Sequence, residues 1–183
     1  MTRVPLVPPD DADAVVAAVF ETFRAEGRDP IALYRALANA PKMLRAYSTL
    51  ARGLRYEAES PRALRELSIL RTAQLVHSEY EWSHHRGMAE AAGVRDEQVA
   101  ALAAWRESDA FDDRERAVLR ATEEIHAIAL SDDGFAELEA ALGREQAVEI
   151  VLLAGFYQAV ARMIQALGLE VEPAYRDRLD GLD

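Results

Sequence analysis

Apolar residues recur at helical spacing along almost the whole chain, and this pattern constrains the fold more than any other feature of the sequence. Alanine, leucine, glutamate and arginine dominate, glycine is sparse, and no stretch shows the β-branched alternation of a strand. The first apolar stripe consists of Val15, Val16, Val19, Phe20 and Phe23. The pattern predicts an all-α, multi-helix bundle that forms a single domain over residues 1–183.

Caps, prolines and glycines set the bounds of the expected helices. The predicted ranges are 11–26, 30–40, 42–56, 61–75, 78–92, 96–105, 112–130, 135–142 and 145–167. Two of these helices begin at a capping-box pattern, at Ser78 and at Asp112. The last helix is apolar on nearly all sides, which requires burial by neighbouring helices or by a second subunit. The polar tail over residues 170–183 is expected to pack loosely or to reach a partner.

Charge and composition exclude several classes of function. With 32 acidic and 21 basic residues, the chain carries a formal net charge of −11, and this field repels nucleic acid and anionic lipid. The longest uncharged apolar run, 150–161, is too short to span a bilayer, and the N-terminus lacks a signal-peptide core. We therefore expect a cytoplasmic protein with neither a nucleic-acid nor a membrane partner. No nucleotide-binding glycine motif is present, and no cofactor is predicted.

Three of the four histidines, His77, His84 and His85, lie within nine residues. On a helix that begins at Ser78, the side chains of Ser78, Glu81 and His85 share one face, and Glu81 lies one turn from His85. A carboxylate in that position orients the imidazole and raises its pKa, which suits a general acid or base near neutral pH. The same spacing also fits a simple helix cap beside a packing histidine.

A metal site is an alternative interpretation of this segment. Glu81 and His85, with His77 or His84 nearby, offer the nitrogen and oxygen donors that zinc or iron accepts. No H-E-x-x-H motif is present, so we predict no metal.

Two charged residues of the preceding helix have more than one interpretation. Glu66, taken alone, fits a solvated glutamate or one that forms a salt bridge with Arg62 or Arg71. Arg71 interrupts an apolar stripe, where an arginine holds either an anionic substrate or an inter-helix ion pair.

Two segments resemble a known family. They read E-L-S-I-L-R at 66–71 and E-Y-E-W-S-H-H at 79–85, followed by Ala89 and Gly93-Val94. They resemble the core motif of the carboxymuconolactone decarboxylase family, whose superfamily includes alkylhydroperoxidase D. The resemblance places the core motif in residues 61–94, after an N-terminal helical extension over 1–40. It also implies an all-α subunit that assembles into homo-trimers or homo-hexamers.

In alkylhydroperoxidase D, the site that this region resembles consists of a glutamate, then a C-x-x-C pair, then a histidine. On this chain that pattern falls on Glu66, Ser78, Glu81 and His85, so serine and glutamate replace both cysteines. The chain has no cysteine at all, which excludes disulfide chemistry and thiol peroxidase activity. The resemblance therefore implies the decarboxylase-like branch: cofactor-free acid-base decarboxylation, or related lyase chemistry, on a small carboxylated lactone or keto acid.

Such a reaction needs a proton donor and groups that stabilise an enolate. We assign His85 as general acid or base, Glu81 as its orienting partner, and Glu66 as a second carboxylate that relays protons or binds a hydroxyl. Ser78 and Tyr80 are candidate hydrogen-bond donors.

The expected substrate-binding residues are Arg71, His84 and Trp82. Arg71 is the predicted carboxylate clamp, because an acidic protein needs a local positive charge to hold an anion. Two alternatives stay open. One is an isomerase or biosynthetic tailoring enzyme on the same scaffold, and the other is a non-catalytic, oligomeric helical protein that binds a ligand or another protein.

Overall fold

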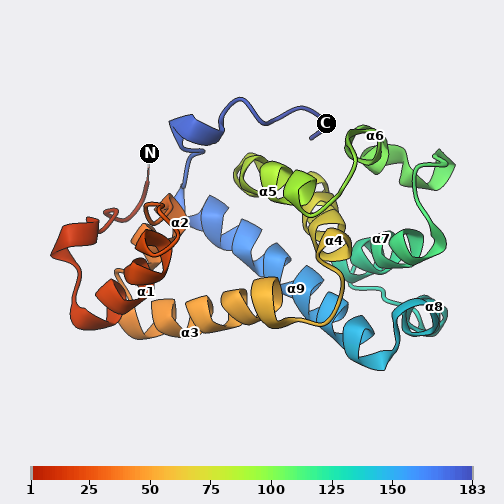
Figure 1. Cartoon of the computed structure of the whole chain (residues 1–183), viewed down its shortest axis with the longest axis horizontal. Coiled ribbons are helices and arrows are strands. Elements are labelled where there is room, and N and C mark those ends of the chain that lie inside the picture. The colour runs from red at the N-terminus through yellow and green to blue at the C-terminus, as the bar shows by residue number, and fades with distance from the viewer. Residues whose placement is uncertain (1, 183) are drawn as a thin grey trace. The chain divides into compact units, whose positions relative to one another are not determined.

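The computed structural model describes residues 2–182, and in this range it contains helices, turns and loops but no strand (Figure 1). Its α-helices are α1 (Ala14–Arg24), α2 (Ala32–Leu37), α3 (Pro41–Arg52), α4 (Arg62–Leu75), α5 (Glu79–Ala91), α6 (Asp96–Ala101), α7 (Asp113–His126), α8 (Asp132–Leu142) and α9 (Arg144–Leu167). Shorter helical turns are η1 (Pro9–Asp11), η2 (Gly53–Glu57), η3 (Leu102–Glu107) and η4 (Pro173–Tyr175). The predicted all-α class is confirmed.

The chain divides into two compact units. Unit 1 comprises residues 1–57 and 163–172, and unit 2 comprises residues 58–162 and 173–183. The N-terminal extension expected over 1–40 falls in unit 1, and the core motif over 61–94 falls in unit 2. The single domain expected from the sequence stays a prediction.

In unit 1, helix starts are set by side chains that accept from backbone amides. Asp13 accepts from the amides of Val15 and Val16 at 2.9 Å each, so α1 begins three residues later than expected. The α2 helix begins at Ala32 and not at the predicted first residue, Pro30, because the backbone amide of Ala32 donates to the Glu172 carboxylate at 2.7 Å. Four of the five residues in the predicted apolar stripe of α1 are buried, namely Val16, Val19, Phe20 and Phe23, whereas Val15 is partly exposed.

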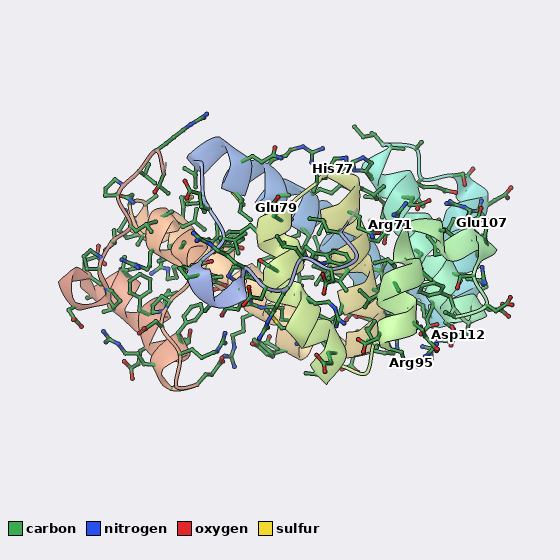
Figure 2. The ribbon with its side chains drawn as sticks, turned by 90° about the horizontal axis from the view of Figure 1, so that it is seen from above. Arg71, His77, Glu79, Arg95, Glu107 and Asp112 are labelled. Atoms are coloured by element: carbon green, nitrogen blue, oxygen red, sulfur yellow. The ribbon has the colours of Figure 1, made fainter. Side chains whose placement is uncertain are left out.

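Unit 2 is built on the hairpin of α4 and α5, which lie side by side (Figure 1). His77 and Glu79 mark the turn between the two helices (Figure 2). Trp82, which is 0% exposed, belongs to the apolar core under this hairpin, together with Leu67, Leu70 and Leu119.

The two predicted capping boxes have different outcomes. At the start of α7, Asp112 and Glu115 exchange both expected hydrogen bonds, at 2.8 and 2.9 Å. At the start of α5, the Ser78 hydroxyl accepts from the Glu81 amide at 3.3 Å, but the Glu81 side chain does not reach back. Only the serine half of that box forms, because the carboxyl of Glu81 is buried instead.

The C-terminal tail makes a few specific contacts with the rest of unit 2, although most of residues 173–182 are exposed. Tyr175 stacks on His84 with ring centroids 4.0 Å apart. Gln74 donates to the Gly181 carbonyl at 2.7 Å, and Gly181 lies against Trp82. The last residue of the predicted tail, Asp183, lies outside the described residues.

The long α9 helix is apolar enough to resemble a membrane span. Its most apolar window has a mean hydropathy of 1.5, but half of that window is buried inside the protein. Core helices of soluble proteins meet the same criterion of length and composition.

Candidate active site

A buried contact between a carboxylate and an imidazole joins α4 to α5 at the centre of the predicted motif. Glu66 on α4 is 0% exposed, and its Oε2 lies 2.8 Å from Nδ1 of His85 on α5. The α4–α5 hairpin creates this contact, because it brings residues 19 positions apart in the chain onto facing sides of two adjacent helices.

Arg62, one helical turn before Glu66, supplies the second charge. Its guanidinium binds Oε1 of Glu66 at 2.6 Å, and the arginine side chain is 28% exposed. Burial acts to raise the pKa of Glu66, but the imidazole of His85 and the guanidinium of Arg62 together hold that pKa below its usual value. Glu66 is therefore an ionised carboxylate at neutral pH.

The ionised Glu66 fixes the orientation of the His85 ring. A carboxylate can only accept, so the Nδ1–H of His85 must be the donor. The edge of the ring meets Tyr157 of α9 at a centroid distance of 5.0 Å and an interplanar angle of 90°. No described residue binds Nε2, and His85 keeps 6% exposure. Nε2 is the nitrogen that is able to exchange a proton with a substrate.

Glu81 does not take the place expected for it. The sequence predicts Glu81 as the orienting partner of His85, but the imidazole turns to Glu66 of the neighbouring helix instead. Glu81 is 3% exposed, and neither of its carboxyl oxygens has a hydrogen-bond partner among residues 2–182. Burial raises the pKa of Glu81 well above its usual value, and the nearby Ser78 hydroxyl offsets only part of this effect.

The surroundings therefore push the pKa values of the two glutamates in opposite directions. His85 and Arg62 lower the pKa of Glu66, whereas burial raises the pKa of Glu81. Paired carboxyl groups whose surroundings push their pKa values apart are a common arrangement for acid-base catalysis.

Ser78 and Tyr80 have partners near the site. Ser78 is the N-cap of α5 and lies beside Glu81. Tyr80 is buried and stacks on His84 at 4.2 Å, and the His84 Nδ1 lies 2.7 Å from the Tyr80 carbonyl oxygen. The other face of His84 is covered by Tyr175.

The three expected substrate-binding residues are not gathered at the Glu66–His85 pair. Trp82 lies in the apolar core, and His84 lies in the stack between the two tyrosines. Arg71, which Figure 2 labels, is held by Glu123 of α7 at 2.6 Å. Of the two arginines weighed as partners of Glu66, Arg62 forms the salt bridge and Arg71 forms the inter-helix ion pair.

The metal alternative gains no support from the side-chain geometry. Within the part of the chain that the structure describes, no group of three or more histidine, aspartate or glutamate side chains is placed to hold a metal ion.

Sequence reasoning missed Tyr157. It lies within an apolar run of α9, 72 positions after His85, and no local spacing connects the two residues. A tyrosine hydroxyl inside an otherwise apolar helix was the available signal, because buried tyrosines need a polar neighbour.

A comparison with protein families now assigns the motif. Residues 41–124 match the model of the Carboxymuconolactone decarboxylase family. This segment belongs to that family. The match contains α4, α5 and the Glu66–His85 pair, so the resemblance seen in the sequence is confirmed. No curated protein matches the sequence.

Solved structures extend the similarity over the whole chain. The apo debrominase Bmp8 superposes with a TM-score of 0.84 at 22% identity, covering 100% of this chain and 99% of that one. A cysteine-to-alanine variant of Bmp8 in complex with 2,3,4-tribromopyrrole gives a TM-score of 0.81 at 22% identity, with 100% of both chains covered. An uncharacterized peroxidase-related protein from Ralstonia eutropha JMP134, described as an alkylhydroperoxidase AhpD core, gives 0.80 at 18% identity, covering 100% and 97%. At such identities the likeness establishes the fold and not the reaction.

Proposed function

We propose that the Glu66–His85 pair is the acid-base centre of a small-molecule enzyme that needs no thiol. The observation that carries this proposal is the 2.8 Å contact between Glu66 Oε2 and His85 Nδ1, while Nε2 has no partner among residues 2–182. Because the 183 residues include no cysteine, the protein's own side chains supply acid-base groups and no redox-active thiol.

The reaction we propose is decarboxylation, or related lyase chemistry, of a small carboxylated lactone or keto acid. Breaking the bond to the carboxylate carbon releases carbon dioxide and leaves an electron pair, which a conjugated carbonyl accepts as an enolate. We assign Glu81, whose pKa is raised by burial, to donate a hydrogen bond to the enolate oxygen when it is protonated. The His85 imidazolium then delivers its Nε2 proton to carbon, and Glu66 stabilises the charged ring in the meantime.

A second candidate is an isomerase or tailoring enzyme that moves a proton without losing carbon dioxide. It is favoured by the position of Arg71, which Glu123 already neutralises, so the expected carboxylate clamp is engaged elsewhere. Arg62 also binds a glutamate, Glu66, but its side chain keeps 28% exposure beside the Glu66–His85 pair. Assays with matched carboxylated and uncarboxylated lactones separate the two candidates.

We also propose a homo-oligomer, a trimer or a hexamer. Val148 and Leu152 of α9 are 54% and 48% exposed, and the exposed Gly155 and Ala159 continue the same face of the helix. An apolar stripe of this kind favours burial against a second copy. Light scattering on Leu152→Glu should show a smaller particle than the wild-type protein, and an unchanged mass would contradict the proposal.

The decisive experiment for function is a screen of carboxylated lactones and β-keto acids, followed by substitution of the pair. Turnover should be lost in Glu66→Gln and in His85→Ala while helical content is kept. The double variant Glu66→Gln, His85→Ala addresses the non-catalytic alternative. Retained assembly and melting temperature would fit catalysis, whereas a collapse of both would favour a structural role for the motif.

A further inference from the structure

Unit 1 contains a second candidate binding region that shares no residue with the Glu66 site. A groove of about 630 Å³ and a smaller recess of about 30 Å³ lie between α1 and α3. Thr22, Ser48 and Arg52 line both, so the recess adjoins the groove. The groove falls within the roughly 300–1,000 Å³ of typical small-molecule sites.

The two walls of the groove differ in chemistry. The wall from α1 is apolar, while the wall from α3 carries hydroxyl and guanidinium groups. These walls include Val15, Ala18 and Val19 on one side, and Arg45, Ser48 and Thr49 on the other. A ligand that fits both walls has an apolar body and a polar group.

The recess concentrates positive charge in a chain whose net charge is −11. Arg28, Arg52 and Arg55 all line it. Arg55 donates to the Tyr34 hydroxyl at 3.0 Å, so its guanidinium is held by a buried ring. These cations can attract an anion that the protein as a whole repels.

Two of the arginines have acidic partners that a ligand could replace. Arg28 pairs with Glu26, and Arg52 pairs with Glu57 at 3.4 Å. The side chains of Arg28 and Arg52 are 44% and 59% exposed, and exposed ion pairs of this kind contribute little stability. A ligand carboxylate could therefore displace these glutamates at a small cost.

The partners of the arginines indicate the kind of anionic group. Arg28 and Arg52 already hold carboxylates, those of Glu26 and Glu57. A ligand carboxylate can reproduce these contacts. We propose that unit 1 binds an amphipathic carboxylate of the medium-chain fatty acid class. The carboxylate lies at Arg52 and Arg55, and the hydrocarbon chain follows the α1 wall.

Isothermal titration with decanoate tests this site directly. Wild-type protein should bind decanoate saturably, and binding should weaken by about tenfold or more in Arg52→Ala, since a charge-assisted hydrogen bond is lost. Ala18→Phe, which fills the groove from an exposed position on α1, should also abolish binding. Arg24→Ala is the matched control, because Arg24 is an exposed arginine of α1 that does not line either hollow.

Three outcomes would overturn the proposal. The first is decanoate binding that is absent, or that is unchanged in both groove variants. The second is decanol or decyl phosphate binding as tightly as decanoate, which would contradict the carboxylate assignment. The third is a change of molecular mass in Ala18→Phe by light scattering, which would make the groove an interface between copies of the chain. Glu66→Gln should bind decanoate like the wild type, so this result is independent of the proposed enzymatic function.

Discussion

Two glutamates of unit 2 lie in ion clusters that look alike and differ in one respect. Glu123 on α7 accepts from Arg71 at 2.6 Å, from Arg106 at 2.5 Å and from the Trp105 indole at 2.8 Å. Glu66 on α4 accepts from one arginine and from an imidazole. Both glutamates have a pKa below the usual value despite their burial.

The difference lies in the donors. Every donor to Glu123 is a guanidinium or an indole, which keeps its proton throughout the physiological pH range. That cluster can only hold α4, η3 and α7 together. The imidazole at Glu66 can release a proton from its unpartnered Nε2, so the same carboxylate chemistry supports proton transfer. A titratable donor with a free nitrogen, rather than a buried carboxylate by itself, therefore marks the candidate site.

The largest expected effect is on turnover, in His85→Ala. Loss of the general acid should lower the turnover rate by about 10²–10⁴-fold, with little change in helical content. Steady-state kinetics on the substrate found in the screen measures this. His77→Ala is the matched control, because His77 is exposed and lies in the turn before α5. Equal loss in both variants would contradict the assignment.

Glu123→Ala should affect stability instead. Its removal leaves the guanidinium of Arg71 and the indole of Trp105 without their acceptor, at a cost of about 2–3 kcal/mol in the free energy of unfolding. Urea denaturation gives this number, and turnover per folded molecule should be unchanged. A stable Glu123→Ala protein without activity would reverse the roles of the two clusters.

The pH dependence of stability should distinguish Glu66 from Glu81. The pKa of Glu66 is lowered on folding, so its contribution is present above the ordinary glutamate pKa of 4.5 and is lost as the pH falls below that value. The pKa of Glu81 is raised, so the folded chain keeps a proton that the unfolded chain releases, and Glu81 destabilises the fold as the pH rises above 4.5.

Melting temperatures measured from acid to neutral pH test these opposite signs. As the pH rises, the melting temperature of Glu81→Gln should increase relative to that of the wild type. Over the same range, the melting temperature of Glu66→Gln should decrease relative to that of the wild type. Two parallel profiles would show that the carboxyl groups do not differ in protonation state.

The smallest expected effect is that of Arg71→Lys. Lysine keeps the charge but cannot supply both the Nε and Nη2 contacts to Glu123, so we expect a loss of about 0.5–1 kcal/mol in stability. The substrate KM should be unchanged. A raised KM without a loss of stability would restore Arg71 as the carboxylate clamp.

The sequence predicts contacts between residues close together in the chain better than contacts between helices. Helical period and caps predict the all-α fold, and the cap at Asp112 forms as its local pattern indicates. The Glu81–His85 pair fails because i,i+4 spacing permits a contact without selecting it. The facing helix α4 offers the His85 ring an ionised carboxylate instead, and this contact between two helices cannot be predicted from local spacing. The contact between Tyr157 and the His85 ring is of the same kind, since only the packing of α9 brings the tyrosine to the ring.

We expect Glu66 to be ionised and Glu81 to be protonated at neutral pH. Infrared spectroscopy of the protein at neutral pH measures this most directly, because a protonated carboxyl has its own C=O stretch. We predict a buried carboxyl band that is present in the wild type and in Glu66→Gln, and that disappears in Glu81→Gln. A wild-type spectrum without that band, or a band that persists in Glu81→Gln, would contradict the account.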